Sequence, residues 1–222
     1  MEKKPIITID GPAGAGKSTV SKILAKKFNY VYLDTGALYR ALAYKALKTG
    51  ISIDDPAALE DLCANTEVFL KNVNGHLRVY VDGEDVEKKI RTEEVGLTAS
   101  KISTFPIVRE KLLELQREAG VRGGIVVEGR DMGSVVFPKA DFKFYLDASI
   151  DERTKRRHKE LLLRNDTPRY ESIKKDMQAR DKQDSQREIA PLKAPEGAII
   201  IDSDHLSIEG VVEKIISNVS MK

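Results

Sequence analysis

The strand, loop and helix at the start of the chain constrain its fold more than any other feature. Ile6, Ile7 and Ile9 are apolar and β-branched, which predicts a short buried strand. Three glycines follow within residues 11–16, where the chain can turn tightly, and from Ser18 onward apolar residues recur at helical spacing. A strand that passes through a glycine-rich turn directly into a helix predicts an α/β fold.

The spacing within this turn, Gly11-x-x-x-x-Gly16-Lys17-Ser18, is typical of a phosphate-binding loop. Its backbone amides would cradle the inner phosphates of a nucleoside triphosphate, Lys17 would neutralise the outer ones, and the Ser18 hydroxyl would bind Mg²⁺. The alternative is a glycine-rich turn without a ligand, which the strand–loop–helix context disfavours. The predicted nucleotide-binding residues are Gly11, Pro12, Ala13, Gly14, Ala15, Gly16, Lys17, Ser18 and Thr19.

The composition is that of an ordinary globular protein, with 41% hydrophobic and 32% charged residues among 222. This length allows one α/β domain with a small insert, or two small domains. A net charge of +2 does not indicate nucleic-acid or membrane partners. The single cysteine, Cys63, excludes an intramolecular disulfide, and no segment has the ~20 apolar residues that cross a bilayer. We therefore expect a cytoplasmic protein.

Four further apolar runs, each ending at a polar residue, predict strands at 31–34, 125–128, 142–146 and 198–202. Helical patterns separate these runs, so the five strands are expected to form a mostly parallel sheet flanked by helices on both faces. In such a sheet, ligands bind beyond the carboxyl ends of the strands.

A different pattern interrupts this alternation of strands and helices. Residues 67–73 and 76–81 alternate between apolar and polar, and Asn74-Gly75 between them is the strongest short signal for a hairpin. Thr92 can cap the helix that follows. We predict a small antiparallel insert with a helix over residues 63–104, so that residues 1–62 and 105–222 form the core domain.

Charged residues cluster near the ends of the predicted strands. Glu128 would hold Mg²⁺ through water or, alternatively, would be an ordinary strand-end acid that caps a helix. Arg180, Asp184 and Arg187 have the spacing of one helix face. They would form a phosphate-binding stripe or, on spacing alone, a solvated ion pair.

The basic run at residues 153–159 has three interpretations. It could be a solvated helix face or a weak nucleic-acid patch, and next to a triphosphate site it could instead belong to a lid, over about residues 151–168. A lid that excludes water would prevent hydrolysis of the phosphate donor.

Several motifs together resemble the bacterial cytidylate kinases, a branch of the nucleoside monophosphate kinases with a short lid. The resemblance extends from Pro5 almost to the end of the chain, and its later motifs are more specific than the phosphate loop. It implies a P-loop kinase fold in which the insert binds the nucleoside monophosphate. The matching segments are 9–18, 33–40, 90–95, 105–109, 128–133, 135–138, 146–149 and 180–187.

The resemblance implies a role for each matching residue. The residues that match the cytosine contacts are Ser100, Arg109 and Asp131. The ribose contacts correspond to Arg180 and Asp184, and the residues around the acceptor phosphate to Arg40, Arg130 and Arg187. Thr35 matches a further substrate-binding position, where the family also has serine, so the hydroxyl group is kept. The arginines that match the lid are Arg153 and Arg157. The residues implied in catalysis are Lys17, Arg130, Arg187, Arg153 and Arg157.

The activity that the resemblance implies is transfer of the ATP γ-phosphate to CMP or dCMP, with Mg²⁺, by a monomer that binds neither nucleic acid nor membrane. Glu128 departs from the family, which has aspartate before Gly-Arg-Asp. Three alternatives remain: a UMP or shikimate kinase, a nucleotide switch that binds partners, and a nucleic-acid-binding protein that uses the basic run at 153–159, which the near-neutral net charge disfavours. The chain lacks the Asn-Lys-x-Asp motif that would indicate a GTPase.

Overall fold

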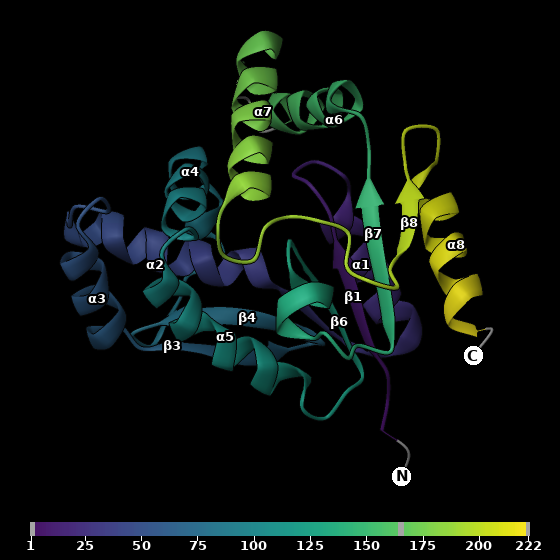
Figure 1. Ribbon diagram of the computed structural model, residues 1–222, viewed down its shortest axis with the longest axis horizontal. Coiled ribbons are helices and arrows are strands. Elements are labelled where there is room, and N and C mark those ends of the chain that lie inside the picture. The colour runs from purple at the N-terminus through teal and green to yellow at the C-terminus, as the bar shows by residue number, and fades with distance from the viewer. Residues whose placement is uncertain (1–2, 164–166, 221–222) are drawn as a thin grey trace. The chain divides into compact units, whose positions relative to one another are not determined.

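The computed structural model describes residues 3–163 and 167–220, which divide into two compact units (Figure 1). The first unit comprises residues 1–6 and 25–128. The second comprises residues 7–24 and 129–222, so it contains both the glycine-rich loop and the C-terminal half of the chain.

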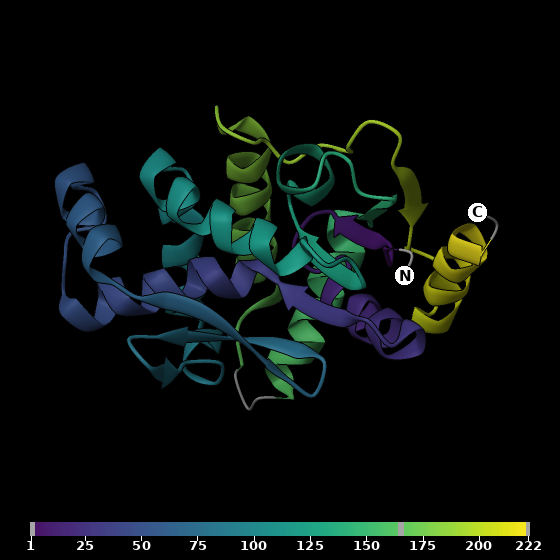
Figure 2. The ribbon, with the colours of Figure 1, turned by 90° about the horizontal axis from the view of Figure 1, so that it is seen from below.

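A mixed sheet organises the first unit. Its strands are β2 (Val31–Asp34), β3 (Val68–Val73), β4 (His76–Val81), β5 (Glu84–Asp85) and β6 (Ile125–Gly129). β2 pairs in parallel with β6, while β3 and β4 form the antiparallel hairpin that lies side by side in Figures 1 and 2. β4 also pairs in parallel with β2, through Tyr32 and His76, so the hairpin extends the strand order β3-β4-β2-β6.

The two-residue turn at Asn74-Gly75 accounts for the hairpin of β3 and β4. Asn74 and Gly75 have φ values of 54° and 82°, the left-handed conformation that a two-residue hairpin turn requires. The predicted hairpin is therefore confirmed.

Local signals begin and end the helices of the first unit. Asp55 accepts from the Ala57 amide and Thr92 from the Val95 amide, so both act as N-caps, and Gly50 ends a helix in the left-handed conformation at φ 69°. Leu38, Leu42 and Leu59 are fully buried in the core that these helices form with the hairpin. The helices are α2 (Thr35–Thr49), α3 (Pro56–Asn65), η1 (Lys89–Arg91), α4 (Glu93–Ile102) and α5 (Pro106–Gly120).

The second unit contains three parallel strands in the order β1-β7-β8, namely β1 (Ile6–Asp10), β7 (Phe142–Asp147) and β8 (Ile199–Asp202). Ile7, Ile9 and Phe144 are fully buried, as the run of isoleucines predicts. Helix α8 lies beside β8 in both views, and α6 lies against α7 (Figures 1 and 2). The helices are α1 (Lys17–Phe28), η2 (Met132–Val136), α6 (Ile150–Leu162), α7 (Tyr170–Gln186) and α8 (Ile208–Ser220).

The five predicted parallel strands are all present, each within two residues of its predicted bounds. Helix α6 ends at Leu162, within the predicted lid over about residues 151–168. Residues 164–166 of the predicted lid lie outside the described part of the chain.

Candidate functional site

The glycine-rich loop adopts a backbone that other residues would strain. Gly11 has φ 146°, and a Cβ atom there would lie 2.0 Å from the carbonyl oxygen of Leu146. Gly14 has φ 77°, and a Cβ atom there would lie 2.8 Å from Met177. The glycines are thus required both by conformation and by close packing. Because α1 begins at Lys17, the loop ends at the positive end of a helix dipole, where an anion is stabilised.

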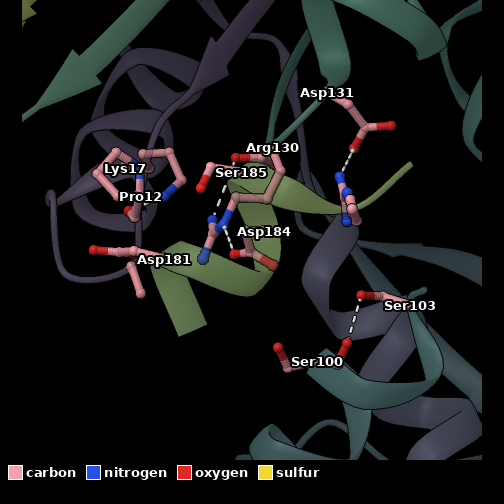
Figure 3. A network of polar contacts seen from close by, with 12 residues as sticks. Pro12, Lys17, Ser100, Ser103, Arg130, Asp131, Asp181, Asp184 and Ser185 are labelled. Atoms are coloured by element: carbon pink, nitrogen blue, oxygen red, sulfur yellow. Dashed lines mark hydrogen bonds and ion pairs between the residues drawn. The ribbon is translucent and has the colours of Figure 1, made fainter. Parts of the chain in front are cut away.

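Lys17 lies back across this loop. Its ammonium donates a hydrogen bond to the carbonyl oxygen of Pro12 at 2.6 Å, and its side chain is buried (Figure 3). Ser18 and Thr19 are exposed at the first turn of α1. The loop therefore offers an ammonium, two hydroxyls and the first amides of a helix to a phosphate chain.

Asp10 precedes the loop and is fully buried. Its carboxylate accepts hydrogen bonds from the amides of Met132 and Gly133, each at 2.8 Å. Burial raises the pKa of Asp10 to about 6, although these two bonds and Lys17 oppose the rise.

Arg130 follows β6 and forms an ion pair with Asp184 on α7, with Nε 2.9 Å from Oδ2 (Figure 3). Burial by itself would raise the pKa of Asp184, but Arg130 and Arg180 outweigh this effect and lower it. Asp184 is therefore a carboxylate at neutral pH, which can accept hydrogen bonds from a hydroxyl-bearing ligand.

Asp131 and Arg187 form a second, more deeply buried pair. Arg187 Nη2 lies 3.4 Å from Asp131 Oδ1, and both side chains are at most 5% exposed. Arg187 Nε also donates to the carbonyl oxygen of Ala190 at 2.7 Å. The sequence suggested that the helix stripe could be a solvated ion pair, but Asp184 and Arg187 are buried and paired with the two residues after Gly129.

The arginines of α6 differ from one another in their surroundings. Arg153 is buried, and its guanidinium donates to the carbonyl oxygens of Ala148 and Ala13 at 2.8 and 3.2 Å and pairs with Asp181 at 2.6 Å. Arg157 is partly exposed and pairs with Glu160 on the same helix. Arg153 thus links the phosphate loop to α6 and α7.

Arg156, which was not among the predicted site residues, contacts two loops. It donates to the carbonyl oxygen of Ser203 at 2.7 Å, to the Ser203 hydroxyl at 3.0 Å and to the Ala15 carbonyl at 3.4 Å. Its only sequence signal is its place in the basic run at 153–159.

In the first unit, Asp34 organises two arginines. Its Oδ2 atom accepts from Arg40 at 2.7 Å and from Arg91 at 2.9 Å, while Oδ1 caps α2 at the Ala37 amide. Burial would raise the pKa of Asp34, but the two guanidinium groups hold it well below its usual range. Arg40 was a predicted site residue, whereas Arg91 was not.

Ser103 links Arg109 to Ser100 by hydrogen bonds. Arg109 donates to the Ser103 carbonyl at 3.3 Å, and the Ser103 hydroxyl donates to the Ser100 carbonyl at 2.7 Å. The guanidinium of Arg109 also lies 5.7 Å from the centre of the Tyr39 ring. The structure therefore places these two predicted cytosine contacts in one cluster.

Glu128 and Thr35 meet at the ends of β6 and β2. Thr35 donates to the backbone carbonyl of Glu128 at 2.7 Å, and the Tyr32 hydroxyl donates to Glu128 Oε1. Glu128 is buried, so its carboxylate has a protein donor in addition to any role towards a metal.

The cytidylate kinase family model matches residues 7–221. The chain belongs to this family. A cytidylate kinase of Citrifermentans bemidjiense is 48% identical over 218 residues, which cover 98% of this chain and 94% of that protein. The cytidylate kinase of Bacillus subtilis is 43% identical over 222 residues, covering 100% of this chain and 99% of its own. The resemblance to cytidylate kinases is therefore confirmed.

Solved structures of other kinases share the fold. A gluconokinase from Sinorhizobium meliloti has a TM-score of 0.51 at 13% identity, covering 100% of this chain and 94% of its own. A shikimate kinase from Bacteroides thetaiotaomicron has a TM-score of 0.50 at 12% identity, covering 97% and 98%. At such low identity the likeness supports the P-loop kinase fold alone.

Within the cytidylate kinase family, ATP-dependent phosphoryl transfer typically needs a divalent metal. No group of three or more histidine, cysteine or acidic side chains that could hold a metal occurs within residues 3–163 and 167–220. Over the same residues, no helix is both long enough and apolar enough to span a membrane.

Among the predicted residues, the structure pairs Arg130 with Asp184 and Asp131 with Arg187, and Ser103 links Arg109 to Ser100. Arg157 bonds instead to Glu160 on its own helix. The structure adds Asp10, Asp34, Arg91 and Arg156 to the predicted residues. Asp10 and Asp34 each end a strand, which is the signal that could have identified them. Arg91 lies inside one of the motifs that match the family, but no spacing in the sequence links it to Asp34.

Proposed function

We propose that this chain transfers the γ-phosphate of ATP to CMP or dCMP, giving ADP and CDP or dCDP. The observation that carries the proposal is its family membership over residues 7–221, which includes both the phosphate loop and the Arg130–Asp131 turn. The acceptor phosphate oxygen would attack the γ-phosphorus in line, without a covalent enzyme intermediate.

The phosphate loop would bind the donor. Its amides and the N-terminus of α1 face the place where a triphosphate is held in such loops, and Lys17 would move from the Pro12 carbonyl to the β- and γ-phosphates. Because the Lys17 ammonium is already buried beside the loop, little reorganisation is needed.

Mg²⁺ would be held by the exposed Ser18 hydroxyl together with the phosphates of ATP. When bound, it neutralises charge on the phosphate oxygens. Glu128, whose Oε1 atom accepts from the Tyr32 hydroxyl, is proposed to contact Mg²⁺ through water.

The base of the acceptor would be read by Asp131, whose carboxylate can accept from the exocyclic amine that cytosine has and uracil lacks. Arg187 holds this carboxylate in place. Ser100 and Arg109 are the further residues proposed to contact cytosine.

The sugar and phosphate of the acceptor would be bound by charged groups. Asp184, kept ionised by its neighbouring arginines, would accept from the ribose with Arg180 beside it. Thr35 is a further proposed substrate contact. The residues proposed around the acceptor phosphate are Arg40, Arg130 and Arg187.

Catalysis would depend on positioning and on charge neutralisation during transfer. Arg130 and Arg187 would stabilise the transferring group from the acceptor side and Lys17 from the donor side. Arg153 and Arg157 are proposed as lid arginines, with Arg153 also holding the loop through Ala13.

We also propose that residues 63–104 form the insert that binds the nucleoside monophosphate. The hairpin β3–β4 and helix α4 lie in it and support this assignment. We propose a cytoplasmic monomer whose partners are its nucleotides, with no nucleic-acid or membrane partner, in keeping with the single cysteine and the near-neutral charge.

The decisive experiment measures ADP release from Mg²⁺-ATP with CMP, dCMP, UMP, AMP, GMP and shikimate in turn. Turnover confined to CMP and dCMP supports the proposal. Turnover with UMP or shikimate would keep the kinase and reject the cytosine pocket. No turnover despite ATP binding would favour a nucleotide switch.

A further inference from the structure

Asp10 has no role in the reaction as proposed above, yet its carboxylate is fully buried beside the site. It is the last residue of β1, and Gly11 of the phosphate loop follows it directly. One oxygen accepts from the Met132 amide and the other from the Gly133 amide, both at 2.8 Å. Both acceptor atoms are thus used to hold one distant segment of backbone.

The segment that Asp10 holds is a tight turn. The Asp131 carbonyl accepts from the amides of Val135 and Val136 at 2.9 and 3.2 Å, which starts η2. A Cβ atom on Gly133 would lie 2.9 Å from Pro195 and 3.0 Å from the Thr8 hydroxyl. The turn is therefore fixed by Asp10 on one side and by close packing around Gly133.

This turn carries two side chains of the proposed acceptor site. Arg130 and Asp131 immediately precede Met132. Arg130 pairs with Asp184 (Figure 3), and Asp131 pairs with Arg187. A rotation of the Met132 peptide would displace both side chains relative to their partners. Displacements of about 1 Å at a reacting group can cost about 100-fold in rate.

We propose that Asp10 is a positioning residue for the acceptor nucleotide. It holds the 131–133 turn against the end of β1, so that the base-reading Asp131 is fixed relative to the strand that leads into the phosphate loop. This role rests on the proposed function. It predicts that loss of the Asp10 carboxylate impairs acceptor recognition more than ATP binding.

The kinetic test uses Asp10→Asn, which keeps the shape but replaces one acceptor oxygen with an NH₂ group that faces a backbone N–H. We expect the KM for CMP to rise about 100-fold and the preference for CMP over UMP to fall about 10-fold, while the KM for ATP changes less than about threefold. Ser21→Ala is the matched control, because Ser21 is also a fully buried polar residue of the second unit but lies on α1, and the atoms nearest to Gly133 belong instead to Pro195 and Thr8.

A second measurement does not depend on activity. Amide hydrogen exchange at Met132 and Gly133 should be slow in the unmodified protein, faster by about 10-fold or more in Asp10→Asn, and unchanged in Ser21→Ala. If the unmodified protein does not phosphorylate CMP, the proposed function fails, whereas the exchange data still decide whether Asp10 holds the turn.

Gly133→Ala provides an independent route to the same displacement, because its methyl group would push the turn away from Pro195 while Asp10 stays intact. It should reproduce the rise in KM for CMP with little change for ATP, and it tests the proposal even if Asp10→Asn fails to fold. Equal losses for CMP and ATP in these variants would overturn the proposal, as would unchanged exchange at Met132 and Gly133 in a folded Asp10→Asn.

Discussion

The Asp34 carboxylate accepts a hydrogen bond from Arg40 Nη2 at 2.7 Å, and it caps α2, the helix on which Arg40 lies. The same oxygen accepts from Arg91, which joins η1 to this network. Because Asp34 is buried, the pair is not screened by solvent as a surface ion pair would be. One strand-end carboxylate thus orients an arginine proposed to bind the acceptor phosphate.

Asp34→Asn is expected to lower the free energy of unfolding by about 2 kcal/mol, because two partly buried guanidinium groups lose their charged acceptor. Chemical denaturation at pH 7 measures this. Asp54→Asn is the control, since Asp54 forms an exposed ion pair with Lys101 and its loss should cost at most about 0.5 kcal/mol. Similar effects in the two variants would mean that the Asp34 network contributes no more than a surface pair.

Asp10 should give the fold an unusual pH dependence. Its pKa rises to about 6 on folding, so the folded state binds the proton more tightly than the unfolded chain, whose aspartate has its ordinary pKa near 3.8. This stabilisation is complete below that ordinary value and is lost as the pH rises through about 6. Asp34, with its lowered pKa, acts in the opposite direction, because its stabilisation is lost as the pH falls.

Asp10→Asn removes the first contribution alone. The difference in unfolding free energy between Asp10→Asn and the unmodified protein should therefore shift in favour of the variant by about 2 kcal/mol as the pH rises from 4 to 7, on top of the pH-independent loss from the broken hydrogen bonds to the 131–133 turn. Denaturation curves across this range measure the difference, and Ser21→Ala should show no such change with pH. A constant difference at every pH would contradict the raised pKa of Asp10.

Arg153 and Arg157 lie one helical turn apart but should respond differently to truncation. Arg153→Ala removes contacts to two backbone carbonyls and to Asp181, and we expect a loss of about 2 kcal/mol in stability and a higher KM for ATP, because the Ala13 carbonyl loses its donor. Arg157→Ala should leave the melting temperature within about 1 °C. Equal stability in both variants would argue against the anchoring role of Arg153.

Asp131→Ala should reduce discrimination between CMP and UMP by about 100-fold, because the acceptor for the cytosine amine is lost while uracil never used it. The ratio of kcat/KM for the two substrates measures this, and the KM for ATP should change little. If both acceptors lose activity equally, Asp131 does not read the base.

Glu128→Gln should raise the Mg²⁺ concentration for half-maximal rate by about 10-fold if Glu128 contacts the metal through water. Tyr32→Phe is the control, because it keeps the carboxylate and removes only the hydroxyl that bonds to it. An unchanged Mg²⁺ requirement in Glu128→Gln would mean that Glu128 has only a structural role at the ends of β2 and β6.

The strands, the hairpin and the phosphate loop could be predicted because their signals are local. The isoleucines of β1, the Asn74-Gly75 turn and the glycine spacing of the loop each act over a few residues, and the backbone conformation follows from sterics. The family resemblance added residue roles that no spacing could supply. The local sequence signals and the family resemblance both predicted the α/β fold that is observed.

The partners of the charged side chains depended on tertiary structure. Asp10 meets backbone amides 122 and 123 residues further along the chain, and Asp34 meets Arg91 57 residues away. Whether an arginine such as Arg153 is exposed or buried is decided by which helix packs against it, which the spacing along α6 does not encode. The sequence by itself determined the elements and the phosphate loop, whereas sheet order and helix packing decided which charges are buried together, because those contacts exist only once distant segments have folded.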